Sequence, residues 1–186
     1  MNVDWEAGVR DPTRVAALQR SGLVGTLPDD AFDRLLELAM ALTGAPRGCL
    51  SLVDAENTSA LSSLGFPEDT VLIAPNQFSL CKFVVSTGRP LVVDDTRNDP
   101  RTSGDPAVEA FDAAAWAGYA IEDDHGNILG TFCVMDSVPH EWTAQDLHVL
   151  STLAKAASSE IALRQARAEV NASHWEIEAL RAARVE

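Results

Sequence analysis

Apolar residues near the start of the chain recur with the period of a helix. Over residues 32–40 they follow the spacing i, i+3, i+4, i+7, which places them on one face of an amphipathic helix. Gly44 and Pro46 end this helix, because glycine suits a helix C-terminus and proline cannot continue a helix. An earlier helix begins at Asp11 and Pro12, a typical cap followed by a typical first helical residue. The pattern therefore predicts two helices at the start of the chain.

After these helices the pattern changes to short apolar runs bounded by turn-forming residues, which is typical of strands. Such runs occupy 49–53, 58–64 and 91–93. Between them, residues 66–77 contain two prolines and predict an irregular connection, and residues 80–87 predict a short helix. The middle of the chain therefore combines strands with one short helix.

Two longer strands form a predicted hairpin. Residues 114–122 and 127–135 flank the favourable turn sequence at 123–126. Both faces of the second strand are largely apolar. We therefore expect this strand to lie in the centre of its sheet and to be covered on both sides.

The last predicted element is a long helix. Thr143 and Asp146 form a variant of the capping box, and Trp142 and Leu147 flank it as a hydrophobic staple. From there to the last residue the sequence has no proline or glycine. The apolar positions expected to face the domain are Leu147, Leu150, Ala154, Ala157 and Ile161.

The second half of this helix carries a separate apolar stripe that is out of phase with the first. Its members are Leu163, Ala166, Val170, Ser173, Ile177 and Leu180. Their alternating spacing of three and four is a weak heptad pattern, which needs a partner helix. We expect a coiled coil in a homodimer, with Val170, Ile177 and Leu180 at the dimer interface. The alternative is a single solvated helix supported by its many charged side chains.

Composition narrows the classes of function. The 186 residues contain 14 Lys and Arg against 28 Asp and Glu, a formal charge of −14, and the basic residues do not cluster. Such an acidic chain repels nucleic acid and anionic membranes, so we expect neither as a partner. No run of about 18 apolar residues occurs, and the first ten residues lack the apolar segment of a secretory signal. An odd number of cysteines at wide spacing forms no disulfide framework, so we expect a cytoplasmic protein.

Motifs for common chemistries are absent from the sequence. It contains no nucleotide-binding loop, zinc-protease motif, serine-hydrolase motif or CxxC pair. Its four histidines are spaced too widely for a recognised metal triad. The sequence alone therefore requires no metal and no cofactor.

Five short motifs occur in a fixed order along the chain. They are Phe78-Ser79-Leu80-Cys81, Thr-Gly-Arg-Pro-Leu-Val-Val at 87–93, Asp99-Pro100-Arg101, Trp116-Ala117-Gly118, and Gly-Thr-Phe-Cys-Val-Met-Asp at 130–136. Together they resemble the bacterial signalling and sensor branch of the GAF domain family. The resemblance implies an α/β fold of the α+β type. In this fold a central antiparallel sheet has helices on one face, a small pocket on the other, and a long C-terminal helix.

The resemblance also implies a regulatory role. GAF domains of this kind are typically input modules of histidine kinases, phosphatases or transcription regulators, and many form dimers through their terminal helices. We therefore expect a flexible lead-in over 1–12, a sensory domain over 13–163, and a helical extension over 164–186. The extension leads towards an output domain in cis or in trans. A small-molecule ligand is expected, and enzymatic activity is not.

The pocket that the resemblance implies lies on one face of the sheet. The residues expected to bind a ligand there are Phe78, Ser79, Cys81, Asp99, Arg101, Trp116, Tyr119 and Phe132. Trp116 replaces a tyrosine of the family pattern and Tyr119 occupies a usually small position, which indicates a reshaped or filled pocket. Asp99 and Arg101 are interpreted as turn-forming residues, or Arg101 as an anchor for an anionic ligand.

Two other functions are kept as alternatives. A ligand-free dimerisation or scaffold module is favoured if Trp116 and Tyr119 fill the pocket. An enzyme is the third candidate, because free methionine sulfoxide reductases share this fold. Their cysteine arrangement, however, does not match Cys49, Cys81 and Cys133. Cys81 and Cys133 are interpreted as small buried residues, with a redox pair as the alternative.

Overall fold

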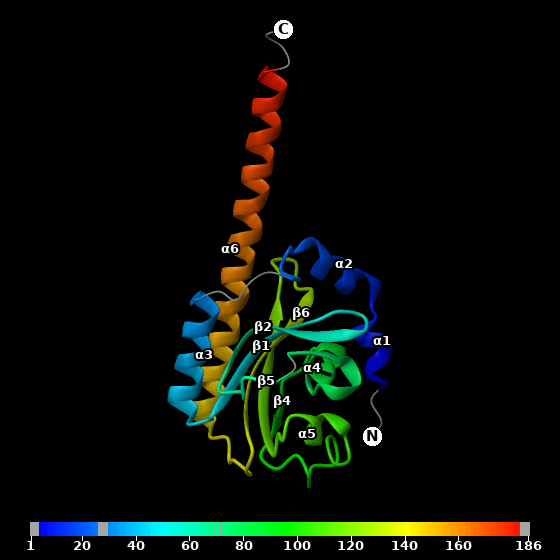
Figure 1. Cartoon of the computed structure of the whole chain (residues 1–186), viewed down its shortest axis with the longest axis vertical. Helices are drawn as coiled ribbons and strands as arrows, with labels where there is room; N and C mark the ends of the chain where they lie inside the picture. Colours follow the sequence, from blue (N-terminus) through cyan, green and yellow to red (C-terminus); the bar gives the residue numbers. More distant parts are fainter. Residues whose placement is uncertain (1–3, 26–29, 71, 183–186) are drawn as a thin grey trace.

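A computed structural model describes residues 4–25, 30–70 and 72–182, with side chains described through residue 171. In this part of the chain six antiparallel strands form one sheet (Figure 1). Their order across the sheet is β3-β2-β1-β6-β5-β4. The strands are β1 (Arg47–Val53), β2 (Asn57–Leu64), β3 (Ile73–Pro75), β4 (Leu91–Val93), β5 (Ala115–Glu122) and β6 (Ile128–Asp136). The prediction that β6 is central is confirmed, since it pairs with β1 on one side and β5 on the other.

Helices cover both faces of this sheet (Figure 1). One face is packed by α3 and α6, and the other by α1, α4 and α5. The helices are α1 (Trp5–Val9), α2 (Pro12–Arg20), α3 (Asp30–Thr43), α4 (Cys81–Thr87), α5 (Pro106–Ala110) and α6 (Ala144–Ala182), and Asn76–Phe78 form a 3-10 turn. The second half of α6 extends away from the domain (Figure 1). Among the described helices, none combines the length and the apolar character needed to cross a bilayer.

Alternation of side chains along the central strands divides the interior into two cores. On β6, Phe132 and Val134 belong to the core beneath α3 and α6, whereas Cys133 and Met135 belong to the core beneath α4. Most of the stripe predicted to attach the last helix to the domain is buried in the first of these cores: Leu150, Ala154, Ala157 and Ile161. A single strand therefore forms part of both cores.

Two predicted helix starts are confirmed by their hydrogen bonds. At α6 the Thr143 amide donates to the Asp146 carboxylate at 2.9 Å, and the Asp146 amide donates to the Thr143 hydroxyl at 3.2 Å. At α2 the Asp11 carboxylate accepts the Arg14 amide at 2.9 Å. These caps satisfy amides that the first turn of a helix leaves without partners.

The N-terminus differs from the flexible lead-in that the sequence predicts, because helix α1 packs there on α4. Val9 is fully buried, and a Cβ at Gly8 would lie 2.6 Å from the Cα of Ser86. The following helix is held by the buried guanidinium of Arg14, which donates to the Val53 carbonyl at 2.6 Å. A helix of five residues is too short to show a periodic pattern, so its position depends on these tertiary contacts.

The connection predicted to be irregular contains a short edge strand. β3 pairs with β2, with Ala74 opposite Thr58. Ile73 is 64% exposed, and Pro75 has no amide to donate. Neither alternation nor composition therefore marks a strand here.

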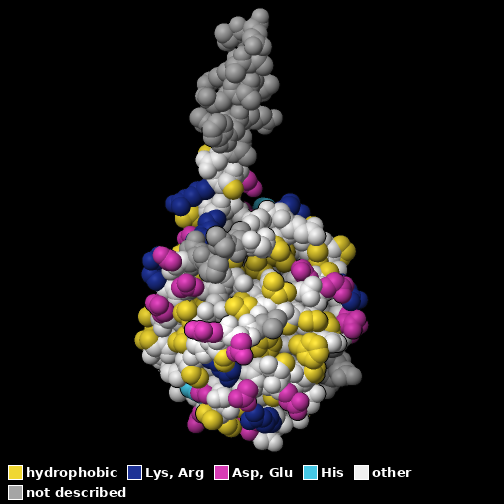
Figure 2. Space-filling view, in the orientation of Figure 1, with side chains coloured by type: hydrophobic (Ala, Val, Ile, Leu, Met, Phe, Trp, Pro, Cys, Tyr) yellow, Lys and Arg dark blue, Asp and Glu magenta, His cyan; other side chains and the backbone are white. Residues whose placement is uncertain are grey.

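Charged side chains are dispersed over the molecular face shown in Figure 2. Acidic side chains there lie among apolar and uncharged ones, and basic side chains stand singly or in small groups. Several basic residues in the described part are paired: Arg10 contacts Glu6 and Glu56, and Arg97 contacts Asp112. This face thus presents no extended basic surface of the kind that binds nucleic acid.

Candidate functional site

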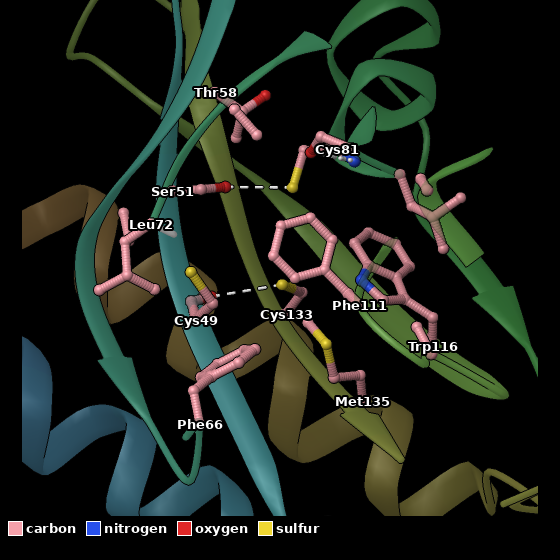
Figure 3. Close-up of a pocket in the computed structure, with 16 residues that line it drawn as sticks. Cys49, Ser51, Thr58, Phe66, Leu72, Cys81, Phe111, Trp116, Cys133 and Met135 are labelled. Carbon is pink, nitrogen blue, oxygen red and sulfur yellow. Dashed lines mark hydrogen bonds between the residues drawn. The ribbon is translucent and has the colours of Figure 1, made fainter. Parts of the chain in front are cut away.

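An apolar cavity of about 60 Å³ lies between the sheet and α4–α5, on the face opposite α6 (Figure 3). Its lining is formed by Cys49, Ser51, Thr58, Ala60, Phe66, Leu72, Ala74, Ser79, Leu80, Cys81, Ala107, Phe111, Ala113, Trp116, Cys133 and Met135. One water needs roughly 10–15 Å³, and a cavity of about 150 Å³ holds benzene. The space therefore fits a molecule with only a few non-hydrogen atoms. Haem, a tetrapyrrole or a cyclic nucleotide would require the surrounding elements to move apart.

Three aromatic side chains line the cavity, with Phe111 beside Trp116 and Phe66 nearer to Cys49 (Figure 3). Trp116 of β5 is 2% exposed, and Phe66 and Phe111 are half-buried. Gly118 makes room for the indole, because a Cβ at this position would lie 2.4 Å from the Trp116 ring. The polar side chains in the lining are hydroxyls and thiols. A charged group inside the cavity is therefore weakly screened, and hydrogen bonds from these side chains are what stabilise it.

Three cysteines contribute their side chains to this cavity (Figure 3). Cys49 and Cys133 lie directly opposite each other on β1 and β6, and Cys81 is the first residue of α4. The Cys133 thiol donates to the Cys49 carbonyl at 3.4 Å, and Cys81 Sγ lies 3.1 Å from Ser51 Oγ. All three are free thiols. The described residues include no group of three His, Cys, Asp or Glu arranged to hold a metal ion.

Hydrogen bonds and burial give two of these thiols different protonation states. The pKa of Cys81 is lowered to about 6, because hydrogen bonds from the Cys133 thiol and from the Ser51 and Ser79 hydroxyls outweigh the effect of burial. The pKa of Cys133 is raised well above its usual value by hydrogen bonds with Cys49 and Cys81 and by burial. At neutral pH Cys81 is therefore mainly a thiolate, and Cys133 stays a protonated thiol.

Asp99 and Arg101 bind each other in the loop after β4, outside the cavity lining. Arg101 Nη2 lies 2.7 Å from Asp99 Oδ2 and donates to the Val92 carbonyl at 2.7 Å. The hydrogen bond between the two side chains lowers the pKa of Asp99 and raises that of Arg101. In the same loop, the Asp95 carboxylate accepts the Arg97 amide at 3.1 Å. These contacts fit the turn-forming interpretation, since the Arg101 guanidinium already has a carboxylate and a carbonyl as partners.

Three of the eight residues predicted at the pocket line the cavity: Ser79, Cys81 and Trp116. The other five lie outside the lining: Phe78, Asp99, Arg101, Tyr119 and Phe132. Phe78 belongs to the 3-10 turn before α4 and is half-buried there.

The prediction that Tyr119 and Phe132 line the pocket is wrong, because their side chains point to the other face of the sheet. These two residues lie opposite each other on β5 and β6, and both face the core beneath α3 and α6. Side chains alternate between the faces of a sheet, and Trp116 and Cys133 are the residues that point into the cavity. Tyr119 therefore does not fill the pocket, whereas Trp116 does.

Several lining residues were absent from the predicted site. Met135 follows Cys133 by two residues on β6, so alternation from that cysteine could have identified it. Cys49 could be found only with the register between β1 and β6. Phe66 and Phe111 lie just beyond the ends of β2 and α5, in segments without a periodic pattern.

The second half of α6 presents apolar side chains beyond its contact with the domain. Ile161 is fully buried, whereas Leu163 is 45% exposed and Val170 is 67% exposed. Of the predicted dimer interface, Val170 is thus open to solvent in the single chain. Ile177 and Leu180 lie outside the residues whose side chains are described.

Comparison with known proteins identifies the fold. The family model described as "GAF domain" matches residues 27–161. A search of curated protein sequences finds no match to the chain. Among solved structures, the blue-light absorbing form of the PixJ GAF domain of Thermosynechococcus elongatus is 13% identical, with a TM-score of 0.64, covering 88% of this chain and 95% of that one.

Two further structures extend this likeness. The GAF domain of the Acinetobacter phosphoenolpyruvate-protein phosphotransferase is 14% identical, with a TM-score of 0.62, covering 86% of this chain and 99% of that one. The free methionine-R-sulfoxide reductase of Neisseria meningitidis, solved with its substrate, is 19% identical, with a TM-score of 0.56, covering 89% and 96%. At these identities the structures establish a common fold. Together with the family match over most of its length, they show that the chain belongs to the GAF domain family.

Proposed function

We propose that this chain is a sensory domain in signal transduction, in which the state of the cavity is passed to α6. The observation that carries the proposal is the position of β6 between the two cores. Cys133 and Met135 line the cavity, while Phe132 and Val134 pack beneath α3 and α6. Protein interiors are densely packed and transmit strain. A shift of β6 on the cavity face therefore changes the packing on the face covered by α3 and α6.

The cavity limits the class of signal. Its volume of about 60 Å³ and its mainly apolar lining favour an uncharged molecule with few atoms, or a chemical change in a lining side chain. Such a signal shifts the domain between two conformations only if it binds one of them more tightly than the other, or stabilises one of them more. The cavity therefore supports a compact chemical signal rather than a large cofactor.

The partner of α6 in this proposal is a second copy of the chain. Leu163 and Val170 are both exposed and stand seven residues apart, as in a heptad repeat. Leu38 and Leu42 are also exposed on α3, which packs beside α6 (Figure 1). A parallel homodimer buries these side chains and brings the two extensions together, ready to lead to an output domain in cis or in trans.

Xenon provides a test of coupling between the cavity and α6, because this gas enters dry apolar cavities. Amide hydrogen exchange of the full chain is measured with and without xenon under pressure. We expect slower exchange in β6 and in the part of α6 packed against the sheet, residues 150–161. Ala113→Leu, which fills the cavity, should abolish the response, and Ala156→Leu, at an exposed position of α6 outside both apolar stripes, should keep it. Xenon binding that leaves α6 unchanged would contradict the proposal.

A ligand-free dimerisation module is the second candidate. The observation that favours it is the small size of the cavity beside the buried indole of Trp116. This candidate predicts a stable dimer whose α6 exchange is the same with xenon, without xenon and in Ala113→Leu. The same experiment therefore distinguishes the two functions.

A further inference from the structure

The thiols in the cavity are accompanied by hydroxyl groups that can stabilise a charged sulfur. The Ser51 hydroxyl lies 3.1 Å from Cys81 Sγ, and Thr131 is the residue opposite Ser51 on β6. The Thr131 hydroxyl is fully buried and has no partner within hydrogen-bond distance in the described part of the chain. Buried polar groups nearly always have partners, so an unpaired donor beside a sulfur cluster needs an explanation.

A small oxidant can reach this cluster. Cys81 lines a cavity of about 60 Å³, and Leu72 of the same lining is 41% exposed, so the lining extends to the surface of the molecule. Hydrogen peroxide is little larger than water, for which roughly 10–15 Å³ is enough. The cavity therefore accommodates a small hydroperoxide next to the Cys81 sulfur without rearrangement.

We propose that Cys81 is a hydroperoxide-reactive cysteine and that Cys133 resolves it into a disulfide. The Cys81 thiolate attacks one peroxide oxygen, the O–O bond breaks, and the leaving hydroxide takes a proton to become water. Cys81 is thereby oxidised to a sulfenic acid. The Cys133 sulfur then attacks the Cys81 sulfur, the S–S bond forms, the S–O bond breaks, and the hydroxyl leaves with the Cys133 proton as a second water. Two electrons pass from the two thiols to the peroxide.

The interaction between the two thiols sets the order of these steps. The pKa of Cys133 is held high by its hydrogen bond with Cys49, by its hydrogen bond with Cys81, by burial and by the charge of the Cys81 thiolate, so Cys133 stays protonated. Oxidation of Cys81 removes that charge, and Cys133 can then lose its proton and attack. The disulfide joins the start of α4 to β6 across the cavity. Transmission of this change to α6 rests on the proposed sensory function, whereas the oxidation itself does not.

Mass spectrometry of the reduced full chain treated with hydrogen peroxide tests the assignment. The wild type should lose two hydrogens and yield a peptide pair linked through Cys81 and Cys133. Cys133→Ser should stop at a sulfenic acid on Cys81 that dimedone traps, and Cys81→Ser should form neither product. Thr58→Val is the matched control, because Thr58 also lines the cavity but its hydroxyl donates to Asn76 rather than to a sulfur. It should oxidise as the wild type does.

The same samples show how the inference can fail. A folded wild type, verified by circular dichroism, in which Cys81 stays reduced contradicts it. A disulfide mapped to another pair, or a dimedone adduct on Cys49, also overturns the assigned roles. If the Cys81–Cys133 disulfide forms but hydrogen exchange in α6 is unchanged, the chemistry stands and the proposed sensory function fails.

Discussion

The Ser51 hydroxyl allows a direct test of what stabilises the Cys81 thiolate. Its oxygen lies 3.1 Å from Cys81 Sγ within the buried lining of the cavity, and it lowers the pKa of that thiol. Ser51→Ala removes this donor and leaves the β1 backbone in place. We expect the ionisation of Cys81 to move to higher pH as a result.

The size of this change follows from the strength of the lost hydrogen bond. A hydrogen bond to a charged group contributes about 1.5–3 kcal/mol, and about 1.4 kcal/mol corresponds to one pH unit. From the present pKa of about 6, the midpoint of ionisation should rise by about one to two pH units. At pH 7 the ionised fraction of Cys81 then falls from most of the population to about half or less.

The rate of alkylation by iodoacetamide, measured against pH and read by peptide mass at Cys81, reports this midpoint. Thr58→Val is the control, because Thr58 also lines the cavity but its hydroxyl donates to Asn76 at 2.8 Å. Its midpoint should match that of the wild type. An unchanged midpoint in Ser51→Ala would refute the reasoning, since the thiolate would then be stabilised without this hydroxyl.

Three further predictions concern stability and assembly. The folded pKa of Cys81, about 6, lies below that of an unfolded thiol, so its stabilisation is lost as the pH falls through 6. Between pH 7 and pH 5 the unfolding free energy of the wild type, measured by urea titration, should fall by about 1 kcal/mol more than that of Cys81→Ser. An equal fall in both proteins would contradict this. Asp105→Ala leaves a buried lysine without its carboxylate and should cost about 3 kcal/mol, whereas Glu56→Ala, which breaks an exposed ion pair with Arg10, should cost less than about 1 kcal/mol. For the proposed homodimer, Val170→Glu should shift the sedimentation coefficient from dimer to monomer, and Val138→Glu, at a position that is also exposed, should leave the coefficient unchanged.

Local sequence patterns were sufficient to predict an element wherever the residues that determine it lie within a few positions of each other. The capping box of Thr143 and Asp146 and the hairpin turn at 123–126 are read from adjacent positions, and both occur as predicted. The central place of β6 also follows from its own composition, since both of its faces are apolar. Apart from α1 and β3, the main helices and strands could therefore be predicted from local patterns, and the fold followed from the family resemblance of the five motifs.

The cavity could not be predicted in the same way, because distant strands assemble its walls. Cys49 and Cys133 are 84 residues apart and meet only through the register of β1 and β6. A motif gives the position of a residue along the chain but not the face to which its side chain points. Tyr119 was for this reason assigned to the pocket, although it faces the opposite core. The hydrogen bonds that lower the Cys81 pKa come from three separate elements and have no signature in the sequence.

The uninterrupted course of α6 has a mechanical consequence. Its last fully buried core residue is Ile161, and the helix continues to Ala182 without a break. At 1.5 Å per residue this part is a lever arm of about 30 Å. A tilt of about 5° where the helix leaves the sheet displaces the far end by nearly 3 Å, about half of a helical turn of about 5.4 Å. A rearrangement at the sheet too small to alter the fold is therefore amplified at the far end of the helix.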